Sequence, residues 1–144
     1  GFARSGFEAS ACSINGHAQS LAQYLTQIKH DVRLPLVANY CGAMINVSIK
    51  EINTATNRVS FYGSVFPDVV YRLAQPLAGS YEAEFDQAVF NLPEASFSCN
   101  CVLNYLYSGL EGKHTGHVTG PMTFGEVGYV LLNQTMVHLT LEAN

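Results

Sequence analysis

The sequence predicts an α+β fold in which one N-terminal amphipathic helix packs against a long, curved antiparallel β-sheet. Two patterns predict it: apolar residues near the N-terminus recur at spacings of three and four, and along most of the remaining chain they alternate with polar residues. The chain has 144 residues, 48% of them hydrophobic, and no repeat or linker interrupts it. We therefore expect a single domain over residues 1–144, with the helix at about 13–31 and the sheet at about 43–141.

The predicted helix follows an irregular lead-in over residues 1–11. Ser13 is a favourable N-cap, and Pro35 ends the segment because proline disfavours helical backbone in the residue before it. The apolar stripe of this helix consists of Ile14, Ala18, Leu21, Leu25, Ile28 and Val32.

The sheet is predicted from alternation, because successive side chains of a strand point to opposite faces. Residues 43–50 and 58–65 form a hairpin around a turn at 53–57. Strands with one apolar and one polar face are typical of antiparallel sheets, so the helix would cover the apolar face. Further strands are expected at 81–89, 97–108, 113–124 and 129–141, with a short strand or helical turn at 69–74.

The charge balance argues against a nucleic-acid partner, and the lengths of the apolar runs argue against a transmembrane helix. The chain has a net charge of -4 and no basic patch that would bind the backbone of a nucleic acid. No apolar run approaches the roughly 20 residues that cross a bilayer as a helix, so we expect no transmembrane segment. The sequence leaves the oligomeric state open.

The cysteines favour an extracellular protein. Cys12, Cys41, Cys99 and Cys101 form an even set of disulfide candidates, and a first residue other than Met fits processing or excision from a longer chain. Cys99 and Cys101 point to the same face of one predicted strand, so each would pair with Cys12 or Cys41 in an order that stays open. A cytosolic protein with buried thiols is the alternative.

Two glycosylation sequons add to this prediction. Asn46 lies on the polar face of its predicted strand and is the glycosylation candidate. Asn133 falls on the inward face of the last predicted strand, where a glycan has no room.

No motif for catalysis, metal binding or cofactor binding stands out. His114 and His117 lie in a predicted strand, where a spacing of three turns the rings to opposite faces. Neither Gly-x-Ser-x-Gly nor a phosphate-binding loop before a helix is present, and the Cys-x-Cys pair lacks the second pair of a zinc site. We therefore predict a non-enzymatic protein without a metal or a cofactor.

Inward-facing apolar and aromatic residues form a candidate ligand site. They would line a lipophilic cavity between the helix and the sheet, because ligand pockets are mainly apolar. A fully packed core requires the same residue types. The predicted ligand-binding residues are Leu21, Leu25, Ile28, Phe61, Phe85, Phe97, Leu103, Tyr105 and Tyr107.

The order of several segments carries a resemblance. After the predicted helix come Leu34-Pro-Leu36, the hairpin, a strand over Tyr81–Phe90, Leu92-Pro93, Tyr105-x-Tyr107-Ser-Gly109, Gly116-His-Val-Thr-Gly120 and a closing alternating strand over Asn133–Leu141. Over about residues 13–141 this order resembles the tubular lipid-binding superfamily, in particular the takeout and juvenile-hormone-binding proteins of arthropods and the mite group 7 allergens. The resemblance implies a secreted protein whose curved sheet wraps a helix around an apolar ligand.

The leading functional hypothesis is a secreted, non-enzymatic protein that binds a lipophilic small molecule or lipid. One alternative is a module with a packed core that binds a protein or glycan, or assembles with itself, through outer-face residues such as Tyr62, Phe66, Phe90 and Leu106. Another is a small enzyme with His114 or His138 as its general base.

Overall fold

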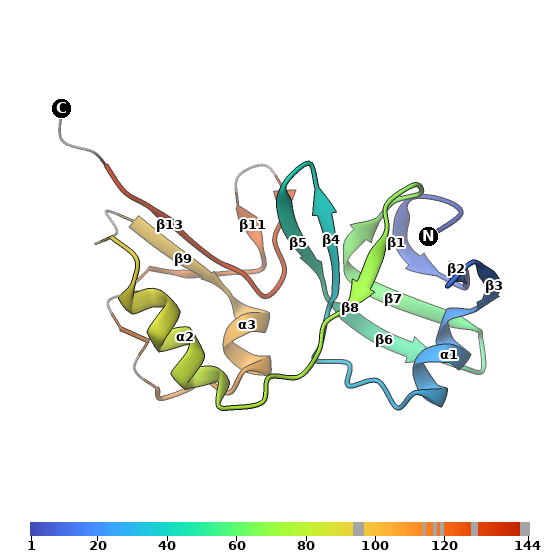
Figure 1. Cartoon of the computed structure of the whole chain (residues 1–144), viewed down its shortest axis with the longest axis horizontal. Helices are drawn as coiled ribbons and strands as arrows, with labels where there is room; N and C mark the ends of the chain where they lie inside the picture. The colour runs from blue at the N-terminus through green and yellow to red at the C-terminus, as the bar shows by residue number, and fades with distance from the viewer. Residues whose placement is uncertain (94–96, 114, 117, 119, 128–129, 142–144) are drawn as a thin grey trace. The chain divides into compact units, whose positions relative to one another are not determined.

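The computed structural model describes residues 1–93, 97–113, 115–116, 118, 120–127 and 130–141. The chain divides into two compact units, Gly1–Gln75 (unit 1) and Pro76–Asn144 (unit 2). Figure 1 shows the elements of both units in chain order.

Unit 1 is mainly β-structure with one short helix. Its elements are β1 (Gly6–Ala9), β2 (Ala11–Ile14), β3 (His17–Ser20), α1 (Leu21–Gln27), β4 (Leu36–Tyr40), β5 (Ala43–Val47), β6 (Ile49–Asn53), β7 (Arg58–Val65) and β8 (Tyr71–Leu73).

Unit 2 combines two helices with short strands. Its elements are α2 (Tyr81–Phe90), β9 (Phe97–Cys101), α3 (Val102–Tyr107), β10 (Met122–Thr123), β11 (Glu126–Val127), β12 (Val130–Leu131) and β13 (Met136–Leu139). No helix in the described part of the chain has both the length and the apolar character needed to cross a membrane.

The predicted helix over 13–31 is wrong in its first half. Helix α1 has only seven residues and begins after Ser20, whose hydroxyl accepts a hydrogen bond from the backbone N–H of Gln23 at 3.1 Å. The preceding segment forms the hairpin β2–β3, in which Ile14 lies opposite His17. The N-cap is therefore Ser20 and not Ser13.

The dipeptide Asn15-Gly16 explains this hairpin. Both residues have positive φ, +51° and +86°, as a two-residue type I′ turn requires. Asn and Gly adopt this conformation at little cost, whereas it interrupts a right-handed helix. The local preference of these two residues therefore outweighs the helical spacing of the apolar residues around them.

One bent strand connects the two larger sheets of unit 1. The sheets have the orders β1-β7-β6 and β5-β4-β8. Strands β5 and β6 follow each other with only the fully buried Ser48 between them, so a single stretch of chain serves both sheets. The predicted hairpin is thus divided between two sheets, although its turn before Arg58 is confirmed.

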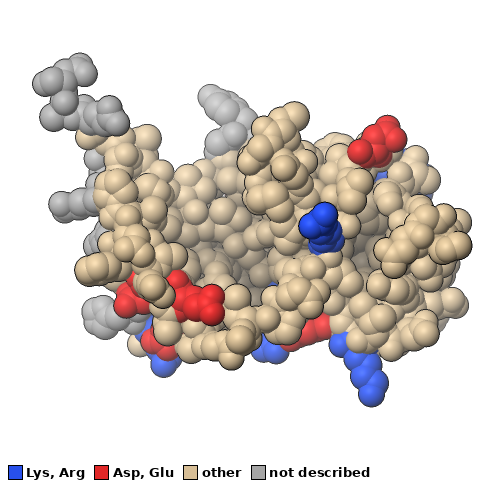
Figure 2. Space-filling model, in the orientation of Figure 1, with Lys and Arg blue, Asp and Glu red and all other residues tan. Residues whose placement is uncertain are grey.

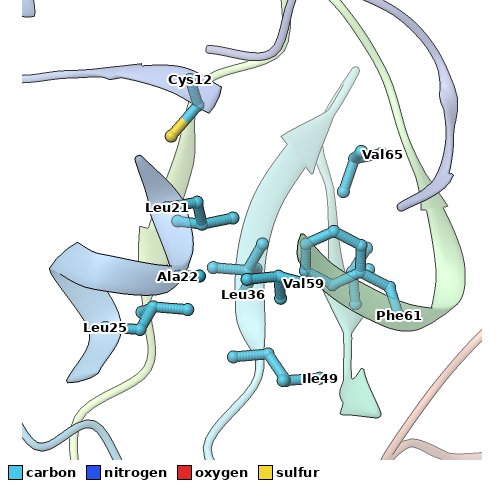
Figure 3. Packing of buried hydrophobic residues seen from close by; sticks show 10 residues of the cluster. Cys12, Leu21, Ala22, Leu25, Leu36, Ile49, Val59, Phe61 and Val65 are labelled. Atoms are coloured by element: carbon cyan, nitrogen blue, oxygen red, sulfur yellow. The ribbon is translucent and has the colours of Figure 1, made fainter. Parts of the chain in front are cut away.

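The core of unit 1 lies between α1 and these sheets. In Figure 3, Leu21 and Leu25 of the helix point toward strand residues such as Leu36 and Val59. The buried members of this cluster are Cys12, Leu21, Ala22, Leu25, Leu36, Val47, Ile49, Val59, Phe61 and Val65. Their burial is the main stabilising contribution available to the unit.

The predicted strand at 81–89 is a helix, α2. Its N-cap is Ser80, whose hydroxyl accepts from the Ala83 N–H at 3.5 Å, and two acidic residues in the first turn interact favourably with the helix dipole. Tyr81 and Phe85 stack at 6.0 Å between ring centroids, and Val89 on the same side is buried. These three residues are spaced by four, which suits a helix, and the strand prediction counted only their even spacing.

The predicted strand at 97–108 changes to a helix halfway. Strand β9 ends at Cys101 and α3 follows at once. β9 pairs antiparallel with β13 but parallel with β10, so the sheet is not wholly antiparallel. The amide of Gly120 donates to the Ser98 hydroxyl at 3.2 Å, and a Cβ at this glycine would collide with the Ser98 carbonyl oxygen.

The prediction of one long curved sheet is therefore wrong. The described residues form five separate sheets of two or three strands each. The predicted strand at 113–124 is reduced to Met122–Thr123 within the described residues, and the one at 129–141 is interrupted by a turn at Asn133 and Gln134. Positions 114, 117 and 119 lie outside the described residues.

Candidate ligand pocket in unit 1

Unit 1 contains a pocket of about 730 Å³ that opens to solvent. One wall is the β2–β3 hairpin from Cys12 to Gly16, together with the N-terminal Phe2. The other wall is β8 with its neighbour Gln75. Leu21 and Tyr24 of α1 and Leu36 of β4 complete the lining. The volume lies within the roughly 300–1,000 Å³ of small-molecule sites.

The lining is mainly apolar, with a few polar groups. The apolar and aromatic lining residues are Phe2, Cys12, Ile14, Leu21, Tyr24, Leu36, Val70, Tyr71 and Leu73. Arg72 contributes the only charged side chain among the residues that line the pocket. In Figure 2 most of the visible face carries neither colour of charge, with acidic side chains over α2 and separate basic and acidic side chains elsewhere, mainly along the lower edge. Such a lining favours ligands that bind through apolar contact.

The wall at Tyr71 is held by polar contacts behind it. The Tyr71 and Tyr40 hydroxyls are hydrogen-bonded at 2.6 Å, and the backbone N–H of Phe66 donates to the Tyr71 hydroxyl at 3.0 Å. Phe2 packs edge-to-face on the Tyr71 ring at 5.2 Å. Burial, followed by the bond to Tyr71, raises the pKa of Tyr40, so the Tyr40 hydroxyl keeps its proton at neutral pH.

A smaller pocket of about 440 Å³ adjoins the first. The two share Gly1, Phe2, Cys12, Ser13 and Val70 in their linings. Phe2 also contacts Phe61 of the core edge-to-face at 6.0 Å. Three core residues, Cys12, Leu21 and Leu36, line the larger pocket directly, so the pocket lies against the core.

Cys12 is an apolar wall residue and not a nucleophile. Its side chain is buried, and burial raises the pKa of its thiol. The thiolate is the reactive form of cysteine, so a raised pKa lowers its reactivity at neutral pH. All four cysteines are free thiols in the structure, with Cys41 exposed and the other three buried.

Unit 2 holds a buried polar network. The Tyr81 hydroxyl donates to Asn104 Oδ1 at 2.5 Å, and Asn104 Nδ2 donates to Asn100 Oδ1 at 2.9 Å. Ser108, one helical turn after Asn104, donates to the same Oδ1 at 3.4 Å. This network joins α2, β9 and α3 and satisfies amides that would be costly to bury alone.

Only some of the predicted ligand-binding residues come together. Leu21, Leu25 and Phe61 share the core of unit 1, and of these Leu21 lines the pocket. Ile28 follows the helix and is 43% exposed. The other five lie in unit 2 on α2, β9 and α3, namely Phe85, Phe97, Leu103, Tyr105 and Tyr107. The arrangement of one helix on one long sheet, on which the predicted cavity depends, is therefore wrong.

The remaining predicted positions are distributed over both units. Asn46 is half-buried in β5, and Asn133 is fully buried. His138 is half-buried in β13, and His114 lies outside the described residues. Within those residues no three His, Cys, Asp or Glu side chains are grouped as metal ligands would be. The four outer-face residues are exposed, two in each unit: Tyr62 and Phe66, and Phe90 and Leu106.

Sequence reasoning missed most of the pocket. The sequence pattern predicts an irregular lead-in at Phe2, a helix at Ile14 and a short strand or helical turn around Tyr71, and the structure places all three residues in the pocket lining. The signal that could have located the first wall is Asn15-Gly16, which predicts a hairpin. No local signal marks the approach of β8 to that hairpin, because it depends on the pairing of β8 with β4.

Comparison with known proteins gives one match. The sequence model of a family described as "Family of unknown function (DUF6976)" matches residues 1–142. No curated protein and no solved structure matches the chain.

Proposed function

Because the chain belongs to DUF6976, a family of unknown function, we propose a function from the pocket of unit 1: non-enzymatic binding of a lipophilic small molecule. The observation that carries the proposal is the pocket of about 730 Å³ with its mainly apolar lining. The ligand lies between the β2–β3 hairpin, α1 and β8.

The binding free energy in this proposal comes mainly from burial. A ligand that buries about 300 Å² of apolar surface gains about 7 kcal/mol at roughly 25 cal/mol per Å², before the cost of its lost freedom. The fixed positions of Phe2 and Tyr71 keep the ordering cost on the protein side low. We therefore expect the pocket to bind such a ligand with moderate affinity and without a covalent step.

The test uses the absence of tryptophan from the sequence. The Tyr24→Trp variant places a single fluorophore in the pocket wall, and the Tyr62→Trp variant places one on β7, at an exposed residue that is not part of the lining. Titration with decanol should shift the emission of the Tyr24→Trp variant in a saturable way and leave that of the Tyr62→Trp variant unchanged. Calorimetry on the unmodified protein supplies the stoichiometry, which should be one.

Two results would contradict the proposal. One is an emission of the Tyr24→Trp variant that does not respond although circular dichroism shows a folded protein. The other is an equal response of both variants, because this indicates unspecific adsorption of decanol.

A further inference from the structure

The free edge of β8 borders the pocket. β8 is the end strand of the sheet β5-β4-β8 and, within the described residues, pairs only with β4. The lining includes Tyr71 and Leu73, which are half-buried, and also Arg72, which alternates with them and is exposed. A pocket that lies along a strand edge meets residues of both faces, whereas one on a single face meets only alternate residues.

The register shows which backbone groups of β8 point to that edge. Ala74 N–H donates to Pro35 C=O at 3.0 Å, and the next opposed pairs are Leu36 with Leu73, Val37 with Arg72, and Ala38 with Tyr71. In an antiparallel ladder, hydrogen-bonded pairs alternate with non-hydrogen-bonded ones. Arg72 therefore bonds to β4, and the N–H and C=O groups of Tyr71 and Leu73 point away from β4 toward the pocket.

These groups are mostly unpaired within the described residues. The Leu73 carbonyl accepts a long contact of 3.5 Å from the Gln75 side chain. For the Leu73 N–H and the Tyr71 carbonyl, the backbone bonds of the described residues include no partner. The Leu73 N–H and the Tyr71 C=O are two residues apart on one strand. A single amino-acid unit in extended conformation can bond to both, because its C=O accepts from the N–H and its N–H donates to the C=O.

We propose that the ligand of this pocket is an apolar N-acyl amino-acid amide whose backbone pairs with the free edge of β8. The proposal rests on the proposed function, since the same pocket holds the apolar part of the ligand. The Leu73 N–H donates to the carbonyl of the bound amino-acid unit, and the N–H of that unit donates to the Tyr71 carbonyl. Its side chain and acyl tail lie against Leu21, Tyr24 and Leu36.

The test compares two probes that differ at one position. The first is N-octanoyl-leucine methylamide, and the second is its ester analogue, in which an oxygen replaces the leucine N–H. Each net hydrogen bond contributes about 0.5–1.5 kcal/mol, and the ester oxygen also repels the Tyr71 carbonyl, so we expect about tenfold weaker binding of the ester. Calorimetry on the unmodified protein measures both affinities.

Amide hydrogen exchange locates the contact. Exchange of the Leu73 N–H, followed by NMR, should slow when the amide probe is added and stay fast with decanol. The Arg72 N–H is the internal control, because it already bonds to β4 and its exchange should change little.

Equal affinities of the amide and the ester, with unchanged exchange at Leu73, would overturn this inference while leaving the proposed function to the decanol titration. A failure of decanol to bind contradicts the proposed function and, with it, the inference. Protection of the Leu73 N–H that rises with protein concentration in the absence of any probe would mean that a second copy occupies the edge, which also overturns the inference.

Discussion

At the scale of single residues, exposure and backbone conformation distinguish positions that look alike in the sequence. The four cysteines are an example, because only Cys41 is exposed. It occupies the first turn position between β4 and β5, with φ of +53°, and the following Gly42 has φ of +101°. Cys12 lies in the pocket wall with a raised thiol pKa.

These differences predict the order of thiol modification. At pH 8, Cys41 should react with a thiol reagent in a fast phase of one equivalent, because it is accessible. Cys12 should react slowly, since burial both shields it and lowers its thiolate fraction. Spectrophotometric titration measures the phases, and Cys41→Ser should remove the fast phase alone. If no thiol reacts even after the protein is unfolded in the absence of a reductant, the cysteines are instead joined in the disulfides that the sequence suggests.

At the scale of elements, the ends of segments decide what forms. Helix α1 closes with two backbone bonds, Lys29 N–H to Thr26 C=O at 3.1 Å and His30 N–H to Leu25 C=O at 2.9 Å. This is a Schellman motif, in which Lys29 takes the left-handed position with φ of +51°. Glycine usually occupies that position because it has no Cβ.

The Lys29→Gly variant should therefore be more stable by about 0.5–1 kcal/mol, because glycine relieves the left-handed strain. Chemical denaturation measures the change. Glu51→Gly is the matched control: this exposed residue of β6 pairs with Ser60 and is outside the left-handed region, and glycine weakens a strand, so the stability of this variant should fall. Loss of stability in both variants would contradict the assigned role of Lys29.

The sequence predicted turns and buried positions better than it predicted whether a segment is a helix or a strand. The turn before Arg58 and the burial of Leu21 and Leu25 follow from local pattern, and the structure confirms them. Helix α2 was missed because Tyr81, Phe85 and Val89 satisfy spacings of both two and four, and in a short segment the N-cap decides between them. The signal at Ser80 was available and outweighs the alternation.

At the scale of the whole molecule, the pocket and the buried polar network belong to different compact units. Burial raises the pKa of Tyr81 in that network. The folded protein therefore keeps the phenolic proton at a pH where the unfolded chain, with a pKa of about 10, releases it. This contribution to stability is complete below about pH 10 and is lost as the pH rises further.

The Tyr81→Phe variant should lose about 1 kcal/mol of stability at pH 7, because the bond to Asn104 is removed. Its unfolding free energy should also fall less steeply above about pH 10 than that of the unmodified protein. Decanol affinity should stay the same, since Tyr81 is not part of the pocket lining. A weaker affinity in a folded variant would show that the two units do not act independently.

By itself, the sequence determined which residues are apolar enough to be buried, where the strongest turns fall, and that the chain carries little charge. Only the tertiary structure decided that β5 and β6 serve different sheets, that β8 ends one of them, and that its free edge faces the Asn15-Gly16 hairpin across a pocket. The physical reason is range. Turn and cap preferences act between neighbours in the chain, whereas strand order and pocket shape arise from contacts between residues that are far apart in it.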